Sequence, residues 1–301
     1  MGLVSYESLE AAVRGCFGAR VEICRSSHAP HGDINSTKIL HLTNGESVFL
    51  KTNTVGNRGF FDAEEEGLIA IMDTGTAATP KLFAKGVDRG GVFSFLMMEV
   101  IERGDVTGKS IAALGYDLAG LHLADAGKYV EDGKYGFLHD NYIGATKQIN
   151  TPKDSWIDFF RECRLKPQFK MAENAFTVSD RKRIIRLMDR LADLLTEPER
   201  PSLLHGDLWG GNHLFDREGN AVLIDPAAYV GHAEADLAMT EMFRPFPQEF
   251  YEAYFARNPL VPGYRERKKL YNLYHELNHF NLFGGGYLRS ALDTVMYFAA
   301  D

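Results

Sequence analysis

The sequence predicts an α+β protein with two lobes, a small β-rich lobe over residues 1–99 and a larger, mainly helical lobe over residues 100–301. Its 301 residues exceed a typical domain of about 100–200 residues but are few for three domains. Runs of β-favouring residues concentrate in the first hundred residues, whereas apolar residues recur at helical spacing beyond them. With 45% hydrophobic and 25% charged residues, the composition is that of a folded globular protein.

The first lobe is expected to be a small sheet with one helix. Its β-favouring runs cover residues 21–25, 38–42, 47–51 and 92–98. Asn44 and Gly45, between the second and third runs, predict a hairpin, so Lys51 is expected to end a strand. Residues 60–72 carry apolar side chains at helical spacing, and Pro80 closes that segment.

The second lobe is expected to be helical, with one strand pair. Apolar residues at spacings of three and four predict helices over residues 111–121 and 184–195, the latter starting at Ser179 and Asp180 and ending before Pro198. Residues 213–215 and 221–224 form the predicted strand pair. The lobes are expected to meet near residues 99–104.

Charge and cysteine content restrict the partners and the compartment. Lys and Arg (33) minus Asp and Glu (41) give a net charge of −8, so duplex nucleic acid, which needs a basic face, is not expected as a partner. Three cysteines, Cys16, Cys24 and Cys163, cannot all pair, which favours a reducing compartment. The N-terminus lacks the features of a secretory signal, and residues 91–98 fall far short of the ~18 residues of a membrane helix. We therefore expect a cytoplasmic protein without a membrane partner; nothing in the sequence indicates an oligomeric state.

The densest cluster of polar residues is residues 205–212, followed by a strand that ends in Asp225. If residues 213–224 form a hairpin, Asn212 and Asp225 face each other at its open end, where opposed Cα atoms lie about 4.5–5.5 Å apart. An amide and a carboxylate oxygen at that separation can share a hard cation such as Mg²⁺. Asp207 is a free carboxylate on the same loop and is the expected acceptor of a substrate proton.

The string from His205 to Asn212, followed by an apolar strand and Asp225, resembles the catalytic loop and the metal-binding Asp of kinases. Kinases also need a strand lysine and a helix carboxylate that orients it, and Lys51 is at the expected place. Glu64 and Glu65 lie on different apolar stripes of the predicted helix, and periodicity does not choose between them. The loop over the phosphates would be residues 27–36, with Gly32 as its only glycine.

Longer strings resemble one family, the fructosamine (ketosamine) kinases, in the aminoglycoside-phosphotransferase-like branch of the protein-kinase-like fold. The resemblance runs through most of the chain. Its pieces include Gly32-Asp33-Ile34-Asn35, Phe49-Leu50-Lys51-Thr52-Asn53, Gly136-Phe137, Asp140-Asn141-Tyr142-Ile143-Gly144, the 205–212 loop, Asp236-Leu237-Ala238-Met239, and Phe283-Gly284-Gly285-Gly286-Tyr287.

The resemblance implies ATP- and Mg²⁺-dependent phosphorylation of the 3-hydroxyl of a ketosamine, a sugar adduct on a free or protein-bound amine. The phosphate ester then eliminates and releases the amine, which is deglycation. By matching motifs, the implied residues are Asp207 as proton acceptor, Asn212 and Asp225 for Mg²⁺, Lys51 with its partner Glu64 for ATP, Gly32 and Asn35 in the phosphate loop, and Met98, Glu99, Val100 and Ile101 as the hinge whose backbone meets adenine. The loop departs from many relatives, which begin it Gly-Gly, because this chain has His31-Gly32-Asp33.

Trp209 stands two residues after Asp207, where protein kinases place a lysine. An aromatic face can pack the apolar C–H side of a sugar, so we predict that Trp209 binds the substrate. The alternative is a core tryptophan beside the loop.

Other interpretations explain fewer residues. Gly104 to Ser110 resembles a P-loop, but three residues separate its glycines where four are needed, so Ser110 is interpreted as a helix N-cap. His275-Glu276-Leu277-Asn278-His279 matches a zinc-protease motif but lacks a third ligand. A kinase fold without turnover should lack one of the catalytic residues. An aminoglycoside- or choline-kinase-like phosphotransferase shares the core but should lack the strings at residues 136–144 and 283–287.

Overall fold

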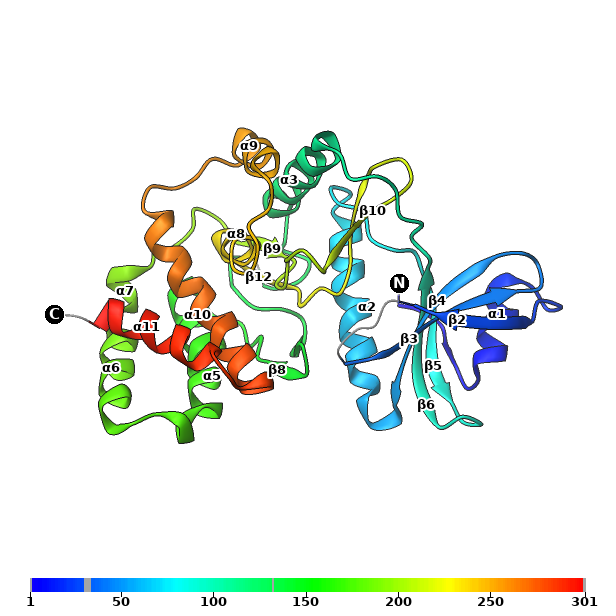
Figure 1. The fold of residues 1–301 in the computed structure, drawn as a ribbon, viewed down its shortest axis with the longest axis horizontal. Coiled ribbons are helices and arrows are strands. Elements are labelled where there is room, and N and C mark those ends of the chain that lie inside the picture. Colours follow the sequence, from blue (N-terminus) through cyan, green and yellow to red (C-terminus); the bar gives the residue numbers. More distant parts are fainter. Residues whose placement is uncertain (1, 30–33, 132, 300–301) are drawn as a thin grey trace.

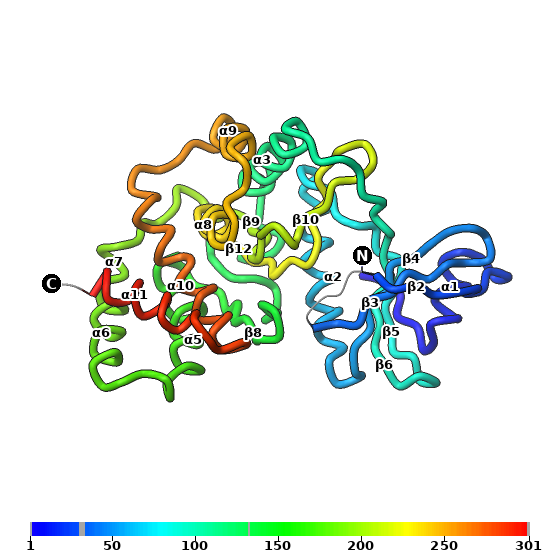
Figure 2. The backbone as a smooth tube through the Cα atoms, viewed as in Figure 1, coloured from blue at the N-terminus to red at the C-terminus, as the bar shows by residue number. Residues whose placement is uncertain are grey.

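The structure is a computed structural model that describes residues 2–29, 34–131 and 133–299. Figure 1 shows two lobes, with the β-sheet lobe on the right and the helical lobe on the left, which confirms the predicted α+β architecture. The last strand of the sheet ends at Glu99, and we keep residue 99 as the proposed division between the lobes. Figure 2 traces the chain from beside α2 to α11 at the far end of the helical lobe.

The N-lobe is built on a six-stranded sheet in the order β1-β5-β6-β4-β3-β2, in which only β1 and β5 pair in parallel. Its elements are β1 (Ser5–Tyr6), α1 (Leu9–Phe17), β2 (Ile23–His28), β3 (Ser36–Leu42), β4 (Ser47–Thr54), α2 (Arg58–Asp73), β5 (Leu82–Asp88) and β6 (Phe93–Glu99). The predicted hairpin is β3–β4, and the predicted helix is α2.

Three elements of this lobe, β1, α1 and β5, were not among those predicted. β1 has two residues, and β5 contains Ala84, Lys85 and Gly86, which have weak β propensity. α1 did carry a signal, because Ser8 caps it and Leu9, Ala12 and Val13 form its buried face. The expectation that Lys51 ends a strand is wrong, since β4 continues to Thr54 by pairing with β6.

The C-lobe contains helices and, among its described residues, three strand pairs. Its helices are α3 (Gly108–Leu123), α4 (Trp156–Phe159), a π-helical segment (Phe160–Leu165), α5 (Lys166–Met171), α6 (Val178–Asp189), α7 (Leu191–Leu194), α8 (Glu234–Thr240), α9 (Gln248–Arg257), α10 (Tyr264–Phe283) and α11 (Tyr287–Ala299). The pairs are β7 (Asn141–Ile143) with β8 (Thr146–Gln148), β9 (Ser202–Leu204) with β12 (Tyr229–Gly231), and β10 (His213–Phe215) with β11 (Ala221–Leu223). Only the last of these was predicted.

Two helix starts differ from the expectation. The N-cap of α3 is Thr107, whose hydroxyl accepts a hydrogen bond from the Ser110 N–H, while the Thr107 N–H donates a hydrogen bond to the Ser110 hydroxyl. Ser110 is therefore the third residue of a capping box and not the N-cap. Thr177 caps α6 in the same way with Asp180, so that helix begins one residue before Ser179.

Helix α2 joins the cores of the two lobes. Phe61 and Leu68 pack with Leu96 and Met98 of β6, whereas Ala70 and Ile71 belong to the large C-lobe core. A second N-lobe core lies between α1 and the sheet. Because α2 is buried against both lobes, its orientation depends on both.

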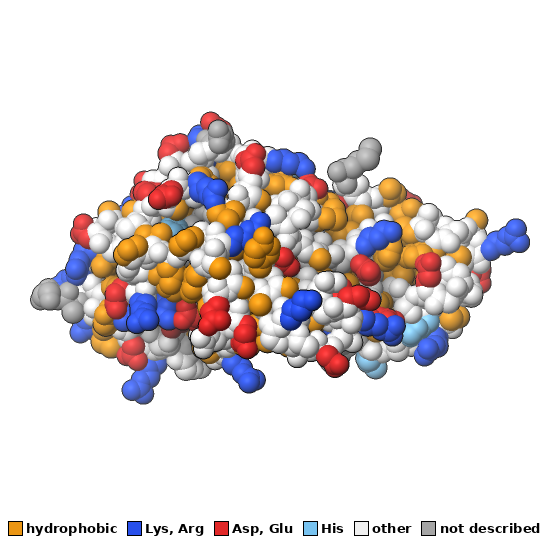
Figure 3. Space-filling view, turned by 90° about the horizontal axis from the view of Figure 1, so that it is seen from above, with side chains coloured by type: hydrophobic (Ala, Val, Ile, Leu, Met, Phe, Trp, Pro, Cys, Tyr) orange, Lys and Arg blue, Asp and Glu red, His pale blue; other side chains and the backbone are white. Residues whose placement is uncertain are grey.

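The surface carries both signs of charge. In Figure 3, which looks down on α3 and α9, basic and acidic side chains alternate among hydrophobic ones. No helix in residues 2–29, 34–131 and 133–299 combines the length and the apolar character needed to span a bilayer.

Two buried histidines in the C-lobe predict acid sensitivity. Burial lowers the pKa of His232 to about 4 and that of His275 to about 3. In the unfolded chain both take up a proton below about pH 6.5, so the unfolded state binds more protons and the free energy of unfolding should fall as the pH decreases from 6.5. Urea unfolding between pH 7 and pH 5 should show this slope, reaching about 1.4 kcal/mol per pH unit for each histidine.

Replacing one of these imidazoles tests the assignment. His275→Gln should reduce the slope of the free energy of unfolding against pH. An unchanged slope in His275→Gln would contradict the assignment.

Candidate active site

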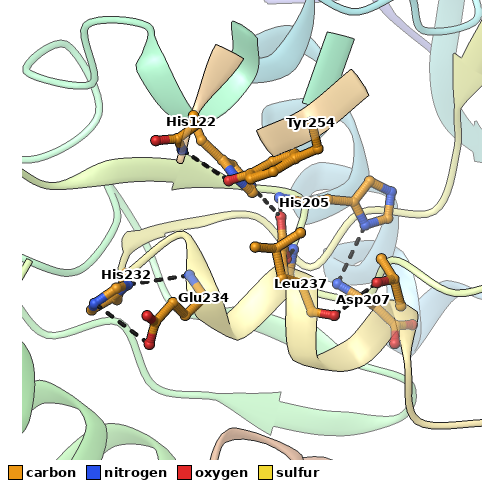
Figure 4. Close-up of polar contacts among 11 residues, drawn as sticks. His122, His205, Asp207, His232, Glu234, Leu237 and Tyr254 are labelled. Carbon is orange, nitrogen blue, oxygen red and sulfur yellow. Dashed lines mark hydrogen bonds and ion pairs between the residues drawn. The ribbon is translucent and has the colours of Figure 1, made fainter. Parts of the chain in front are cut away.

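The predicted catalytic loop leaves β9 at Leu204 and is held by a buried carboxylate from α8. Asp236 Oδ2 accepts a hydrogen bond from His205 N (2.7 Å), and its Oδ1 accepts one from Gly206 N (2.8 Å). His122 of α3 donates to Asp236 through Nε2 (3.0 Å), and the Tyr254 hydroxyl lies 2.7 Å from His122 Nδ1 (Figure 4). Burial works to raise the pKa of Asp236, but the His122 hydrogen bond and the neighbouring imidazoles and amide outweigh it and hold that pKa below its ordinary value.

Sequence reasoning assigned no role to Asp236 or His122. Asp236 lies in one of the strings that carry the family resemblance, but its partners, the backbone N–H groups of residues 205 and 206, lie about thirty positions away in the chain. Gly206 has a φ of +82°, and a Cβ there would lie 2.1 Å from the Ala227 carbonyl oxygen. The loop therefore needs glycine at this position.

His205 connects the loop to the end of β11. Its Nε2–H donates to the Ile224 carbonyl (2.9 Å), and its Nδ1 accepts from the Asp207 N–H (3.3 Å). Figure 4 draws the second of these hydrogen bonds, between the His205 ring and Asp207, as a dashed line. Burial lowers the pKa of His205, which favours the neutral ring that this bonding pattern requires. His205 is thus a buried brace, and Asp207, two residues further along the loop, is half-buried.

The predicted pair of opposed residues is wrong by one position. His213 pairs with Leu223, and Ile224 N donates to the Asn212 carbonyl (3.1 Å), so Asn212 opposes Ile224 and not Asp225. The cause is the turn, in which Asp216 N donates to Asn220 O and the hairpin closes about residue 218. Asp225 is the next residue, with a φ of +54°, where its backbone leaves the strand direction.

Asn212 nevertheless lies beside the expected proton acceptor. Its Nδ2 donates to both the backbone oxygen (2.8 Å) and the carboxylate Oδ2 (3.0 Å) of Asp207. Burial and the nearby Asp225 raise the pKa of Asp207 well above its ordinary value, and the Asn212 amide partly opposes this rise. A carboxylate in such surroundings is a stronger base than one in water, which suits proton abstraction from an alcohol.

Lys51 brings the two lobes together at this site. Its Nζ lies 2.5 Å from Glu64 Oε1 of α2 and also forms an ion pair with Asp225, 174 positions further along the chain. Burial would lower the pKa of Lys51, but the two carboxylates outweigh it and raise the pKa, so the ammonium stays charged. The ion pair holds the pKa of Asp225 below its ordinary value against the effect of burial.

The structure also separates the two candidate glutamates of α2. Glu64 contacts Lys51, whereas Glu65 accepts a hydrogen bond from Leu3 N and pairs with Lys85 of β5 at 2.6 Å. Burial raises the pKa of Glu64 to about 7, although the Lys51 ammonium opposes the rise. Of the two glutamates, Glu64 is therefore the one that contacts the strand lysine, and its role in orienting that lysine stays a prediction of the family resemblance.

The residues expected to hold Mg²⁺ have the chemistry for it. Asn212 directs Nδ2 to Asp207, which leaves Oδ1 as its ligand atom on the other side of the amide. The Asp225 side chain is 42% exposed while one of its oxygens contacts Lys51. One amide oxygen and one accessible carboxylate form a hard oxygen donor set, completed in kinases by nucleotide phosphates and water. These residues fit a magnesium ion.

Trp209 is 39% exposed and belongs to a cluster of ring side chains, called the aromatic wall below, with Phe243, His279 and Phe283. Its ring lies over Gly211 and meets Phe243 edge-to-face with centroids 5.9 Å apart. Phe243 in turn contacts His279 of α10 (5.1 Å), which also meets Phe283. Phe243 was not predicted, and His279 was noted only in the zinc-protease motif, because residues 209, 243 and 279 come together only in the folded chain.

The remaining predicted nucleotide contacts are placed as follows. Asn35 Oδ1 accepts from Asn53 Nδ2 of β4 (2.8 Å), which holds the end of the phosphate loop, whereas Gly32 lies outside the described residues. In the hinge, Met98 is buried, and Glu99 N donates to the Lys81 carbonyl (2.8 Å). Val100 and Ile101 follow β6, and their backbone contact with adenine stays a prediction.

The P-loop-like and the zinc-protease-like motifs both have structural roles in the fold. A Cβ at Gly104 would lie 2.1 Å from the Asp216 carbonyl oxygen, so this segment packs on the β10–β11 turn and forms no phosphate cradle. In the zinc-like motif, His279 Nδ1 donates to the His275 carbonyl, and Glu276 accepts from Ser290 and Thr294. Across the described part of the chain, no group of three His, Cys, Asp or Glu side chains could hold a metal ion.

Comparison with known proteins identifies the family. The sequence pattern of the family described as fructosamine kinase matches residues 6–299. The chain belongs to this family. As a fructosamine kinase family member, it is 40% identical over 283 residues to the chloroplastic protein-ribulosamine 3-kinase of Oryza sativa, covering 92% of this chain and 80% of that one. It is 34% identical to the ketosamine-3-kinase of Mus musculus, covering 96% of this chain and 98% of that one.

Solved structures agree with this assignment. A Haemophilus somnus protein, assigned as a fructosamine-3-kinase, superposes with a TM-score of 0.86 at 27% identity, over 98% of this chain and 97% of that one. An aminoglycoside phosphotransferase solved with AMP-PNP and hygromycin B superposes with a TM-score of 0.62 at 16% identity, over 98% of this chain and 99% of that one. The second likeness concerns the fold alone and confirms the protein-kinase-like class of this fructosamine kinase family member.

Proposed function

We propose that this kinase transfers the γ-phosphoryl group of ATP to the 3-hydroxyl of a ketosamine, free or protein-bound, and thereby starts deglycation. The observation that carries the proposal is the convergence of Lys51, Glu64 and Asp225 from both lobes beside Asp207. That set is the phosphoryl-transfer machinery of kinases. The names of the rice and mouse relatives, a ribulosamine 3-kinase and a ketosamine-3-kinase, support the choice of substrate.

In this proposal each side chain has one task. Asp207 accepts the proton of the 3-hydroxyl while the hydroxyl oxygen bonds to the γ-phosphorus and the bond from that phosphorus to the bridging oxygen of ADP breaks. Lys51, held by Glu64, binds the phosphates of ATP, and Asn212 fixes the Asp207 carboxylate by its hydrogen bond. Trp209 packs against the sugar.

Asn212 and Asp225 would hold Mg²⁺, which supplies charge neutralisation to the phosphates when bound. We also propose a cytoplasmic setting, supported by the three free cysteines, which suit a reducing compartment.

The test is a measurement of ATP consumption with fructoselysine, ribuloselysine, an aminoglycoside and choline as acceptors. We expect turnover with at least one of the sugar-lysine adducts, with the phosphate on the 3-oxygen as located by NMR. Asp207→Asn serves as the control for contaminating kinases. Activity confined to the aminoglycoside or choline would overturn the proposal.

Replacing Trp209 by alanine should raise the KM for the sugar-amine about tenfold while changing the KM for ATP less than twofold, because the indole packs only against the acceptor. Trp209→Phe keeps an aromatic face and should retain most of the affinity. The second tryptophan, Trp156, is fully buried, so quenching of fluorescence by the sugar-amine should disappear in Trp209→Phe. Equal increases in both KM values would indicate that Trp209 has a structural role and does not bind the substrate.

A further inference from the structure

The family-specific string around residue 141 forms the β7–β8 hairpin, which the phosphoryl-transfer machinery does not account for. The hairpin belongs to the C-lobe but lies at the edge nearest α2 (Figure 1). Its two ends carry the amides of Asn141 and Gln148, which are 2% and 1% exposed. Between them, Tyr142 is half-buried and directs its ring toward the N-lobe helix.

The buried amides anchor the hairpin to the segment that follows Asp225. Asn141 Nδ2 donates to the Ala228 carbonyl (2.7 Å), and Gln148 Nε2 donates to the Ala227 carbonyl (3.0 Å). Gln148 Nε2 also donates to Asn141 Oδ1 (2.8 Å), and the Tyr274 hydroxyl donates to Gln148 Oε1 (2.8 Å). A buried polar network that is satisfied in this way is rigid, so the hairpin and the Asp225 turn are held as one unit.

The same unit touches α2 in two places. Pro226 and Ala228 pack on Gly67, where a Cβ would lie 3.0 Å from the proline ring. Tyr142 meets Phe60 edge-to-face with ring centroids 4.2 Å apart. Phe60 precedes Glu64 by four residues, so both side chains lie on one face of the helix, one turn apart.

We infer that Tyr142 is a positioning residue: through Phe60 it sets the orientation of α2 so that Glu64 reaches Lys51. Kinases require the strand lysine and the helix glutamate to be paired before phosphoryl transfer. Through its contacts on both sides, the β7–β8 hairpin couples the Lys51–Glu64 pair to the Asp225 turn, and this coupling needs no covalent modification of the chain. The inference rests on the kinase activity and is independent of which acceptor is phosphorylated.

The test compares Tyr142→Ala with Tyr142→Phe, which keeps the ring, in the wild-type protein and in Glu64→Gln. Calorimetric titration with Mg²⁺ and a non-hydrolysable ATP analogue reports the arrangement of the nucleotide site without any acceptor. We expect Tyr142→Ala to weaken this binding about tenfold and Tyr142→Phe to change it less than about twofold. In the Glu64→Gln background, Tyr142→Ala should cost less than about twofold, because the residue through which it acts is already removed.

Thermal unfolding checks that each variant is folded, and Phe60→Leu, which removes the same ring contact from the α2 side, replaces Tyr142→Ala if that variant does not fold. Unchanged binding in Tyr142→Ala, or an equal loss in both backgrounds, would overturn the inference. Absence of ketosamine phosphorylation with this pattern of nucleotide binding intact would instead contradict only the proposed acceptor.

Discussion

Replacing Asp207 by alanine is expected to lower kcat by about 10²–10⁴-fold while leaving ATP binding nearly unchanged. The side chain lies in the catalytic loop, contacts Asn212 and has a raised pKa, and it is not part of the Lys51 ion-pair network. Its loss removes the base and retains the phosphate contacts. Steady-state kinetics and calorimetric titration with an ATP analogue measure the two effects separately.

The matched control is Asp189→Ala, because Asp189 is an exposed residue at the end of α6, away from the catalytic loop. Its kcat should equal that of the wild type. Turnover of Asp207→Ala within threefold of the wild type would remove Asp207 from the role of base.

Replacing Lys51 by methionine is expected to lower kcat/KM for ATP by about 10²–10³-fold, the loss seen when one preorganised charge-stabilising donor is removed. The methionine fills the same space, but the buried carboxylate of Glu64 and the neighbouring Asp225 lose their common cation. Glu64, whose pKa burial already raises to about 7, should then take up a proton.

Protonation of Glu64 makes the free energy of unfolding of Lys51→Met depend on pH. Because the folded variant binds the proton on Glu64 more tightly than the unfolded chain does, its free energy of unfolding should fall as the pH rises from 5 to 8. The decrease should reach about 1.4 kcal/mol per pH unit, measured by urea unfolding. Lys38→Met, at an exposed position on the adjacent strand β3, is the control and should change neither quantity. Wild-type kcat/KM in Lys51→Met would contradict the assigned contact with ATP.

The contacts within the aromatic wall could not be predicted from the sequence. Trp209 could be singled out because it stands two residues from Asp207. Phe243 stands in no motif and His279 was noted only in the zinc-protease motif, and they join Trp209 only because α8, the segment after it and α10 pack together. Spacing along the chain predicts neighbours within a few residues, and it is silent on neighbours brought together by packing.

The sequence by itself determined the order of the lobes and the family, and it predicted the catalytic loop with Asp207 and Asn212 and the strand lysine, since periodicity and fixed motif spacing are local properties. Periodicity did not decide which glutamate meets Lys51, because adjacent residues of a helix point about 100° apart and packing selects one of them; the family resemblance implied Glu64, and the tertiary structure shows that contact. Only the tertiary structure decided that Asn212 opposes Ile224, because the length of one turn sets the register of a hairpin. The contact of Tyr142 with α2 belongs to the same class, since it joins two lobes whose relative placement is not a property of either segment.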